Sequence, residues 1–370
     1  MITHKICYFN RSSIHYRKNI YMLMDKELPC DFYFGDSRPG KIEPVPYELL
    51  EHFKGEFHNI SIGRFYWQKG ALKLLRSDYT DIITPGDTYC LSTRIMLMLS
   101  KLYKKNIYLW THGAYGDEVG IKKWNIIRSI SKVKGVFLYG EYAKSILKGW
   151  GIPESKLHVI YNSLSYDEQL PLRQSIKPSD FYQMRFNNEN PNIVFIGRLT
   201  TVKKLDQTLK AVALLKEQGL FFNVTFIGDG TEKQKLESLA NELGLINNVW
   251  FYGACYDEKR IAEFLYNADL CVSPGNVGLT AMHAMTFGCP VISHDNFPLQ
   301  MPEFEAIEVG KTGDFFKEND IASLAEAIKR WQSNCGNRED VRKACYDVID
   351  NKYNPHVQIE TLRKTILNNN

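Results

Sequence analysis

The sequence predicts an α/β protein made of two doubly wound, Rossmann-like domains that face each other across a cleft. Three observations lead to this prediction. Short apolar runs alternate with helical stretches along most of the chain, which indicates parallel sheets covered on both faces. The chain has 370 residues, enough for two separate cores. The alternation stops between residues 166 and 191, where polar residues and prolines indicate an interdomain linker.

The expected domain boundaries follow from this break. We predict a first domain at 1–165, the linker at 166–191 and a second domain at 192–351. We expect the helix-like tail at 352–370 to pack back on the first domain. Strand–helix alternation restarts directly after the linker, so the second domain has the same architecture as the first.

The individual elements are predicted from the apolar runs and the helical periodicity. In the first domain, strands are expected at 6–9, 31–34, 88–91, 107–110, 135–139 and 157–161, with helices at 92–104 and 142–149. In the second domain, strands are expected at 193–196, 223–227, 249–252, 270–273 and 290–293, with helices at 205–218, 232–243, 259–267, 279–287 and 321–332. Open α/β sheets bind ligands at the carboxyl ends of their strands, so the loops that follow the strands are the candidate sites.

The composition excludes several classes of function. Lys and Arg total 46 against 42 Asp and Glu, and a net charge of +4 is too small to indicate nucleic-acid binding. The eight cysteines are scattered without a CxxC pair, so we expect reduced thiols rather than disulfides or metal ligands. The N-terminus reads directly into a strand, and no stretch approaches the roughly 18 apolar residues of a membrane span. We therefore expect a cytoplasmic protein.

The first candidate site follows the strand at 193–196. Arg198 leaves the end of this strand, and Lys203 lies close to the start of the next helix. Two cations beside the positive end of a helix suit a diphosphate. Taken alone, the segment is more typical of a solvated basic loop.

Neighbouring segments favour the phosphate interpretation. The strands at 223–227 and 249–252 are each followed by glycine, and the strand at 270–273 runs into a glycine-flanked turn before a helix begins near Leu279. Glycines let a backbone approach a ligand closely, and the free amides at a helix start can bind phosphate oxygens.

This ordered series, from Ile193 to Phe315, resembles the donor-binding domain of family-4 glycosyltransferases, the group 1 type with the GT-B fold found among bacterial surface-polysaccharide enzymes. The matching motifs are GRL…K at 197–203, GDG at 228–230, ADL.V.P at 268–274, G.PVI at 288–292 and G.TG at 310–313. The resemblance implies that Arg198 and Lys203 bind the donor diphosphate and stabilise the departing nucleotide. The donor-binding residues that it implies are Gly197, Gly228, Asn276, Val277, Gly278, Leu279, Thr280 and His283.

The chain departs from the family at two positions. Family members usually carry two glutamates eight positions apart, one touching the donor sugar and one the nucleotide ribose, where this sequence has Gly275 and His283. His283 either hydrogen-bonds a ribose hydroxyl or packs on its helix, and Asn276 and Thr280 are candidates for the lost polar contacts. The acidic turn at 303–308 offers a replacement carboxylate, although a charged surface turn is the simpler interpretation.

The first domain contributes a candidate catalytic histidine. His112 follows the strand at 107–110 and precedes Gly113. A lone histidine is often structural, but the resemblance implies that this one contacts the donor sugar near the reacting carbon. The segment at 140–162 is also similar to a family segment, which places Asn162 at the end of the last strand.

Glu118, His15 and Arg17 are further candidates for contacts with the acceptor or the sugar. Glu118 shares a loop with His112, whereas His15 and Arg17 follow the first strand. A helix N-terminus with ordinary surface charges is an equally good interpretation of His15 and Arg17.

Two features bear on membranes and metals. Basic residues at 122–134 are interleaved with Trp124 and isoleucines, which is compatible with peripheral contact with the inner membrane face or with a solvated helix face. The chain contains no DxD motif, which usually holds a metal-bound diphosphate in glycosyltransferases of the other main fold. We therefore expect arginine and lysine to replace a metal ion, with no cofactor besides the sugar nucleotide.

These features predict the transfer of a sugar from a nucleoside-diphosphate sugar to a glycan or lipid-linked acceptor. The resemblance implies retention of the anomeric configuration and a setting in capsule or lipopolysaccharide synthesis. One alternative is a sugar-nucleotide epimerase on the same fold, which needs acid and base carboxylates such as Asp117, Glu118 or the acidic turn. A non-catalytic protein that binds nucleotide sugars or glycans is a second alternative, because it would explain the missing glutamates.

Overall fold

The computed structural model describes residues 4–36 and 44–367, and these divide into two compact units. The first unit combines the residues up to Ser165 with those from Asn354 onwards, and the second unit spans Tyr166–Tyr353. The C-terminal segment therefore belongs to the first unit, although residues 368–370 of the expected helix lie outside the described part of the chain.

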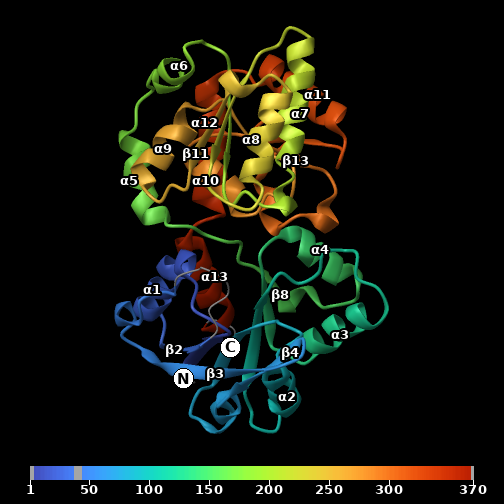
Figure 1. Cartoon of the computed structure of the whole chain (residues 1–370). Coiled ribbons are helices and arrows are strands. Elements are labelled where there is room, and N and C mark those ends of the chain that lie inside the picture. Colours follow the sequence, from blue (N-terminus) through green and yellow to red (C-terminus); the bar gives the residue numbers. More distant parts are fainter. Residues whose placement is uncertain (1–3, 37–43, 368–370) are drawn as a thin grey trace. The chain divides into compact units, whose positions relative to one another are not determined.

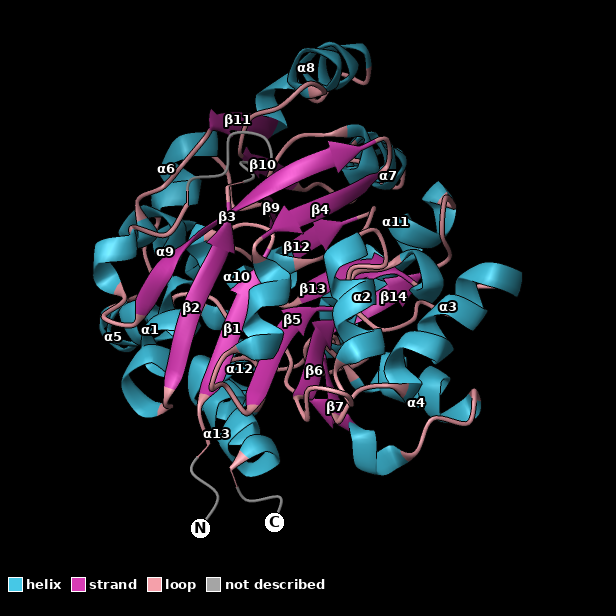
Figure 2. Ribbon diagram, turned by 90° about the horizontal axis from the view of Figure 1, so that it is seen from below, coloured by secondary structure: helices cyan, strands magenta, loops and turns pink. Residues whose placement is uncertain are grey.

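The first unit is built around one mixed sheet (Figure 2). Its described strands are β1 (Ile6–Asn10), β2 (Cys30–Gly35), β3 (Phe53–Ile62), β4 (Phe65–Lys69), β5 (Asp81–Pro85), β6 (Asn106–Thr111), β7 (Gly135–Leu138) and β8 (Leu157–Val159). They lie in the order β4-β3-β2-β1-β5-β6-β7-β8, and these neighbours run parallel except for β3 and β4. The chain thus builds outward from β1 to β4 and then returns to the other side of β1 with β5.

Successive side chains of a strand point to opposite faces of this sheet, and each face has its own core. In β1, Cys7 and Phe9 face a core shared with α2 (Leu91–Leu99), α3 (Gly120–Ser131) and α4 (Glu141–Gly149). Ile6 and Tyr8 face the opposite core, which is covered by α1 (Lys18–Glu27) and α13 (Pro355–Ile366). Helices α1 and α13 pack side by side (Figure 1), so the C-terminal helix closes one face of the N-terminal sheet.

The structure corrects the predicted elements of this sheet. The strand expected at 88–91 is wrong, because these residues form a turn that leads into α2, while the strand of this region is β5 at Asp81–Pro85. The antiparallel pair β3 and β4 was not predicted. It lies at the edge of the sheet, and β3 is largely exposed, so its apolar pattern is weak.

The second unit has a fully parallel sheet among its described strands. These are β9 (Asn192–Ile196), β10 (Asn223–Ile227), β11 (Val249–Gly253), β12 (Leu270–Ser273), β13 (Val291–His294) and β14 (Gly313–Phe316), in the order β11-β10-β9-β12-β13-β14. In chain order this is 3-2-1-4-5-6, the arrangement of a Rossmann fold. The direction of building reverses between β9 and β12, which makes the carboxyl ends of these two strands the expected ligand position.

Helices cover both faces of this parallel sheet (Figure 1). One group consists of α7 (Asp206–Glu217) with α8 (Lys233–Glu242) and α11 (Ile321–Asn334) packed against it. The other group includes α9 (Glu258–Asn267), α10 (Leu279–Thr286) and α12 (Arg338–Asn351). With both faces covered, the strands are buried almost continuously and read as apolar runs in the sequence.

The expected linker at 166–191 is instead part of the second unit. It forms α5 (Tyr166–Ser175) and α6 (Phe181–Phe186), and α5 contacts α9 and α10. Arg173 anchors α5 to α12, because its guanidinium donates hydrogen bonds of 2.9 and 3.0 Å to the carboxylate of Asp350 and lies over the ring of Tyr346. The prolines misled the sequence interpretation, since Pro171 lies inside α5.

We predict that Leu362→Ala in α13 destabilises the first unit by about 2–5 kcal/mol, because this fully buried side chain fills the core beneath α1. Hydrogen exchange measured on the full chain should show faster exchange in β1 and β6, with β9 and β12 unchanged. Lys364→Ala, which removes a side chain that is mostly exposed on the same helix, is the control and should leave both units unaffected. Loss of protection in the second unit alone would contradict this assignment.

Candidate functional site

Two loops meet at the point where the sheet of the second unit reverses its building direction. One follows β9 and carries residues 197–204, and the other follows β12 and carries residues 274–278. The amide of Gly275 donates a 3.0 Å hydrogen bond to the carbonyl of Lys203. A Cβ added to Gly275 would lie 2.0 Å from the carbonyl oxygen of Val202, so the contact leaves no room for a side chain. The family's first glutamate position is therefore filled by the neighbouring backbone.

Lys203 is held by the second of these loops. Its Nζ donates hydrogen bonds of 2.6 Å to the carbonyl and 2.9 Å to the Oδ1 of Asn276. The pKa of Lys203 is lowered to about 8, mainly by burial; the buried carboxylate of Glu303 opposes this shift, and the positive charge of Arg198 adds to it. The hydrogen-bond partners of Nζ at Asn276 are neutral, so the amine keeps a charge that an anion can use.

Arg198 supplies the second cation. Its side chain is exposed, and within the described residues it makes no ion pair. The backbone beside it is fixed, because the amide of Leu199 donates to the carbonyl of Asp229 and the amide of Glu232 donates to the carbonyl of Leu199. A free guanidinium on a fixed backbone suits an anionic ligand at the carboxyl edge of the sheet.

Glycines hold the ends of β9, β10 and β11 close together. A Cβ on Gly228, whose φ is 146°, would lie 1.8 Å from the carbonyl oxygen of Gly197. The amide of Gly197 donates to Ile227, and that of Gly228 donates to Gly253. Gly197 and Gly228 therefore shape the edge on which Arg198 sits.

A buried amide supports the loop after β12, and sequence reasoning missed it. Gln300 accepts a hydrogen bond from the amide of Val277 at 2.9 Å and donates to the hydroxyl of Ser293 and the carbonyl of His294. The hydroxyl of Ser293 in turn donates to the carbonyl of Ser273. The signal in the sequence is slight: Ser293 is a polar residue at the end of an apolar strand, and Gln300 follows a turn.

The start of α10 completes this site. Gly278 precedes the helix with φ of 51°, a conformation that favours glycine, and Leu279 is the first helical residue. Thr280 donates its hydroxyl hydrogen to the carbonyl of Ile196 at 2.9 Å, so it ties α10 to β9 and is not a free donor for a ligand. His283 has a buried Nδ1 without a hydrogen-bond partner, and burial lowers its pKa. The imidazole is therefore neutral at pH 7.

In the first unit, the structure brings His112 and Arg17 together. His112 follows β6, and its ring lies 4.7 Å from that of Tyr139, which follows β7. The guanidinium of Arg17 lies 5.3 Å from the same tyrosine ring. Burial lowers the pKa of His112 to about 4, and the positive charge of Arg17 contributes. His112 is therefore neutral at pH 7, and its catalytic role stays a prediction.

The other candidates of the first unit are placed differently. Glu118 is buried and its carboxylate accepts hydrogen bonds from the amides of Tyr115 and Gly116, so it holds its own loop rather than facing a ligand. Asn162 accepts a hydrogen bond from the amide of Ser163 beyond the end of β8. His15 is exposed, and its ring lies 6.0 Å from that of Tyr16.

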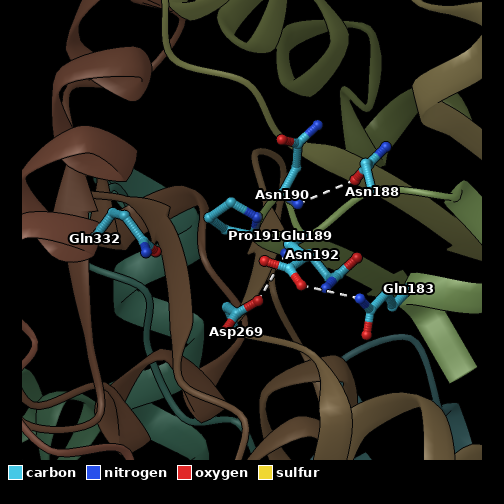
Figure 3. A pocket seen from close by; sticks show the side chains of 8 residues that line it. All are labelled: Gln183, Asn188, Glu189, Asn190, Pro191, Asn192, Asp269 and Gln332. Atoms are coloured by element: carbon cyan, nitrogen blue, oxygen red, sulfur yellow. Dashed lines mark hydrogen bonds between the residues drawn. The ribbon is translucent and has the colours of Figure 1, made fainter. Parts of the chain in front are cut away.

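A polar pocket lies at the opposite edge of the second sheet and is not the candidate site. It has a volume of about 300 Å³ and sits beside the amino ends of β9 and β12 (Figure 3). Asn192 and Asp269 are joined there by a 2.7 Å hydrogen bond from backbone amide to carboxylate, and Gln183 of α6 donates to Glu189. These polar groups bind one another.

The second unit matches a known family model. Residues 177–348 match the model described as glycosyl transferases group 1. Among curated relatives, an uncharacterized 41.2 kDa protein in the cps region of Klebsiella pneumoniae is 27% identical over 299 residues, which cover 78% of this chain and 73% of the relative. The putative glycosyltransferase EpsD of Bacillus subtilis (strain 168) is 30% identical over 148 residues, which cover 39% of this chain and 37% of that relative.

Solved structures share the architecture of the whole chain. The lipopolysaccharide outer core galactosyltransferase WaaB, in its apo form, aligns with a TM-score of 0.72 and 15% identity over 98% of this chain and 99% of that one. Anabaena HepE in complex with UDP aligns with a TM-score of 0.72 and 16% identity over 98% of this chain and all of that one. At such identities the likeness concerns the fold, and the predicted GT-B fold with two Rossmann-like sheets is confirmed.

We predict that Gly275→Ala weakens the binding of inorganic pyrophosphate about tenfold or more, because the added methyl group displaces the loop that carries Lys203. The backbone of Gly275 has no positive φ, so the change tests the contact and not the chain conformation. Isothermal titration calorimetry on the full chain measures the effect. Gly149→Ala is the matched control, since no atom lies within 4 Å of its added Cβ. Unchanged affinity in Gly275→Ala would contradict the assignment of this loop contact.

Proposed function

We propose that this chain, whose residues 177–348 match the model of the glycosyl transferases of group 1, transfers a sugar from a nucleoside-diphosphate sugar to a hydroxyl of a glycan or lipid-linked acceptor. The observation that carries this proposal is the pair of cations at the switch point of the second sheet. Arg198 is unpaired within the described residues, and Lys203 is bound only through neutral oxygens of Asn276 among its described hydrogen bonds. Such a pair can hold the diphosphate and stabilise the charge that develops when the nucleotide leaves.

The names of similar proteins support the choice of substrates. Curated relatives include a putative colanic acid biosynthesis glycosyltransferase of Escherichia coli and the amylovoran biosynthesis glycosyltransferase of Erwinia amylovora. These matches cover about half or less of each relative, so they support the class of enzyme and a setting in polysaccharide biosynthesis. The complex of HepE with UDP-glucose supports a nucleotide-sugar donor for the present fold.

The donor hydroxyls would be recognised without the two family glutamates. Gly275 has no space for a side chain, and His283 is a neutral imidazole with a buried, unpartnered Nδ1. We assign the hydroxyl contacts to neutral groups, namely the imidazole of His283 and the backbone amides of Asn276, Gly278 and Leu279, since the amide of Val277 is bound by Gln300. Neutral donors and acceptors suit hydroxyl groups, whereas the two cations suit the diphosphate.

Two other parts of the proposal concern stereochemistry and metal ions. Retention of the anomeric configuration rests on the family alone. Arg198 and Lys203 would provide the positive charge that a metal ion provides in other glycosyltransferases. Among the described residues, no cluster of three or more His, Cys, Asp or Glu side chains is placed to hold a metal ion. The epimerase alternative is weakened because Glu118 is engaged by loop amides.

We predict that Arg198→Ala and Lys203→Ala each lower the turnover of donor by about 10²–10³, because each removes a charge that stabilises the leaving diphosphate. Release of nucleoside diphosphate from a panel of UDP-, GDP- and ADP-sugars measures this. Lys204→Ala is the matched control, since its amine is paired with Glu318 and Asn319 rather than turned to the site. Near-normal turnover in both variants would sink the diphosphate assignment.

The pH dependence of UDP affinity tests the role of Lys203 in binding separately from its role in turnover. Lys203 has a pKa of about 8 and carries its charge below that pH. The affinity of the unmodified chain for UDP should therefore fall as the pH rises through about 8, and the affinity of Lys203→Ala should not show this fall. A donor that is converted to an epimer without an acceptor would instead favour the epimerase.

Peripheral membrane contact through α3 is a further part of the proposal. Val119, Ile121 and Trp124 are 78%, 79% and 55% exposed, and the guanidinium of Arg128 lies over the ring of Trp124. Exposed apolar and basic groups on one helix suit an anionic lipid surface. The isoleucines that also suggested this in the sequence are core residues: Ile130 is buried, and its neighbours at 126 and 127 pack against the core of the first unit. Within the described residues, no helix is long and apolar enough to span a bilayer.

We predict that Ile121→Ser and Trp124→Ser together reduce co-sedimentation with vesicles that contain phosphatidylglycerol, because both remove exposed apolar surface next to basic groups. Vesicles of phosphatidylcholine alone test the role of charge. Ile246→Ser, which removes an exposed isoleucine of the second unit, is the control. Equal sedimentation of the unmodified chain with and without vesicles would contradict the proposal.

A further inference from the structure

Arg17 occupies an unusual position at the carboxyl edge of the first sheet. Its guanidinium carbon lies 5.3 Å from the ring centres of both Trp110 and Tyr139. It also lies near the phenols of Tyr21 and Tyr8, whose oxygens are 3.2 Å apart. These contacts orient the guanidinium between aromatic rings and phenols.

No carboxylate among the described residues forms an ion pair with Arg17, and its Nε is buried without a hydrogen-bond partner. Aromatic faces and phenols attract a cation but do not neutralise it. A half-buried guanidinium without a counter-ion is costly to keep, whereas an anionic ligand would satisfy both its charge and its donors.

Arg17 lies where open α/β sheets bind ligands, at the carboxyl edge beside a reversal of the strand order. It follows β1, and the chain builds from β1 outward to β4 before it returns to β5 on the other side of β1. This reversal is a switch point of the same kind as the one between β9 and β12 in the second unit. The two neighbouring rings, Trp110 and Tyr139, come from the carboxyl ends of β6 and β7.

We propose that Arg17 and His112 form an oxyanion site in the first unit, which binds a phosphate or carboxylate group carried by one of the two substrates of the transferase. Both side chains lie beside the ring of Tyr139, since the ring of His112 is 4.7 Å and the guanidinium carbon of Arg17 is 5.3 Å from its centre. Arg17 supplies the charge and several N–H donors, and His112 supplies a neutral ring nitrogen for a hydrogen bond.

The site itself is inferred from residues of the first unit alone. Only the identity of the substrate that carries the oxyanion rests on the proposed function. The donor diphosphate and an acidic group of the acceptor are the two sources. An acceptor that carries phosphate or carboxylate next to its reacting hydroxyl would be selected by this site over a neutral one.

Histidine NMR of the full chain tests the proposal without requiring activity. Inorganic phosphate and acetate are titrated into protein labelled at histidine, and the His112 signal is identified by its loss in His112→Gln. Phosphate should raise the pKa of His112, because a bound anion offsets the positive charge of Arg17. In Arg17→Gln the affinity read at this signal should fall about tenfold or more.

Two further variants guard against a purely structural explanation. Arg11→Gln removes an exposed arginine of the same loop, which lies over the ring of Tyr66, and should leave the anion affinity unchanged. Arg17→Lys keeps the charge but loses the planar fork, and should retain part of the affinity. Thermal unfolding shows whether each variant is folded.

The outcomes are distinct. If UDP shifts the His112 signal in the unmodified chain and this shift is lost in Arg17→Gln, the oxyanion is the donor diphosphate. If phosphate or acetate shifts the signal and UDP does not, the oxyanion belongs to the acceptor. If neither phosphate nor acetate nor UDP shifts it in the unmodified chain, or if Arg17→Gln folds and binds the anions as well as the unmodified chain, the proposal is wrong. Failure of the proposed donor site alone would appear as normal turnover in Arg198→Ala and Lys203→Ala, and it would not change the result at His112.

Discussion

The contact between Gly275 and the backbone of Lys203 is the constraint on which the second unit's site depends. It joins the loops after β9 and β12 through backbone atoms, at a distance that no side chain tolerates. This approach allows Asn276 to reach the amine of Lys203 with both of its oxygens. Position 275 has no room for a carboxylate because the backbone that carries Lys203 fills the space. The buried amide of Gln300 fixes the same loop through the amide of Val277.

The two units hold a cationic side chain at the carboxyl edge of a sheet in different ways. In the second unit, Lys203 is held by amide oxygens and Arg198 is left exposed, so the charge stays accessible. In the first unit, aromatic rings hold Arg17 and lower the polarity around it. Both arrangements place an arginine that lacks a described carboxylate partner at the carboxyl edge of a sheet, beside the point where its strand order reverses. In both units, the reversal of the strand order determines where an arginine can reach a ligand at the carboxyl edge of the sheet.

The sequence predicted the second unit better than the first for a physical reason. β10 and β12 have the expected bounds, because strands buried on both faces are continuous apolar runs between glycine turns. The hairpin of β3 and β4 escaped prediction, since an exposed edge strand has a weak pattern. Arg198 and Lys203 could be found from local motifs, but the bond from Lys203 to Asn276 joins residues 73 positions apart and has no local signature. The same holds for Arg17 and His112, which meet only through the sheet order.

The position of α13 in the sequence affects the order in which the two units can fold during translation. Residues 166–353 form a continuous unit and can fold as soon as they have left the ribosome. The first unit is made earlier but lacks Ile359, Leu362 and Ile366, which fill the core beneath α1, until the segment after Asn354 has emerged. The unit that is translated first is therefore the last to be completed, and the part of its apolar sheet face that α13 covers stays exposed while the rest of the polypeptide is made.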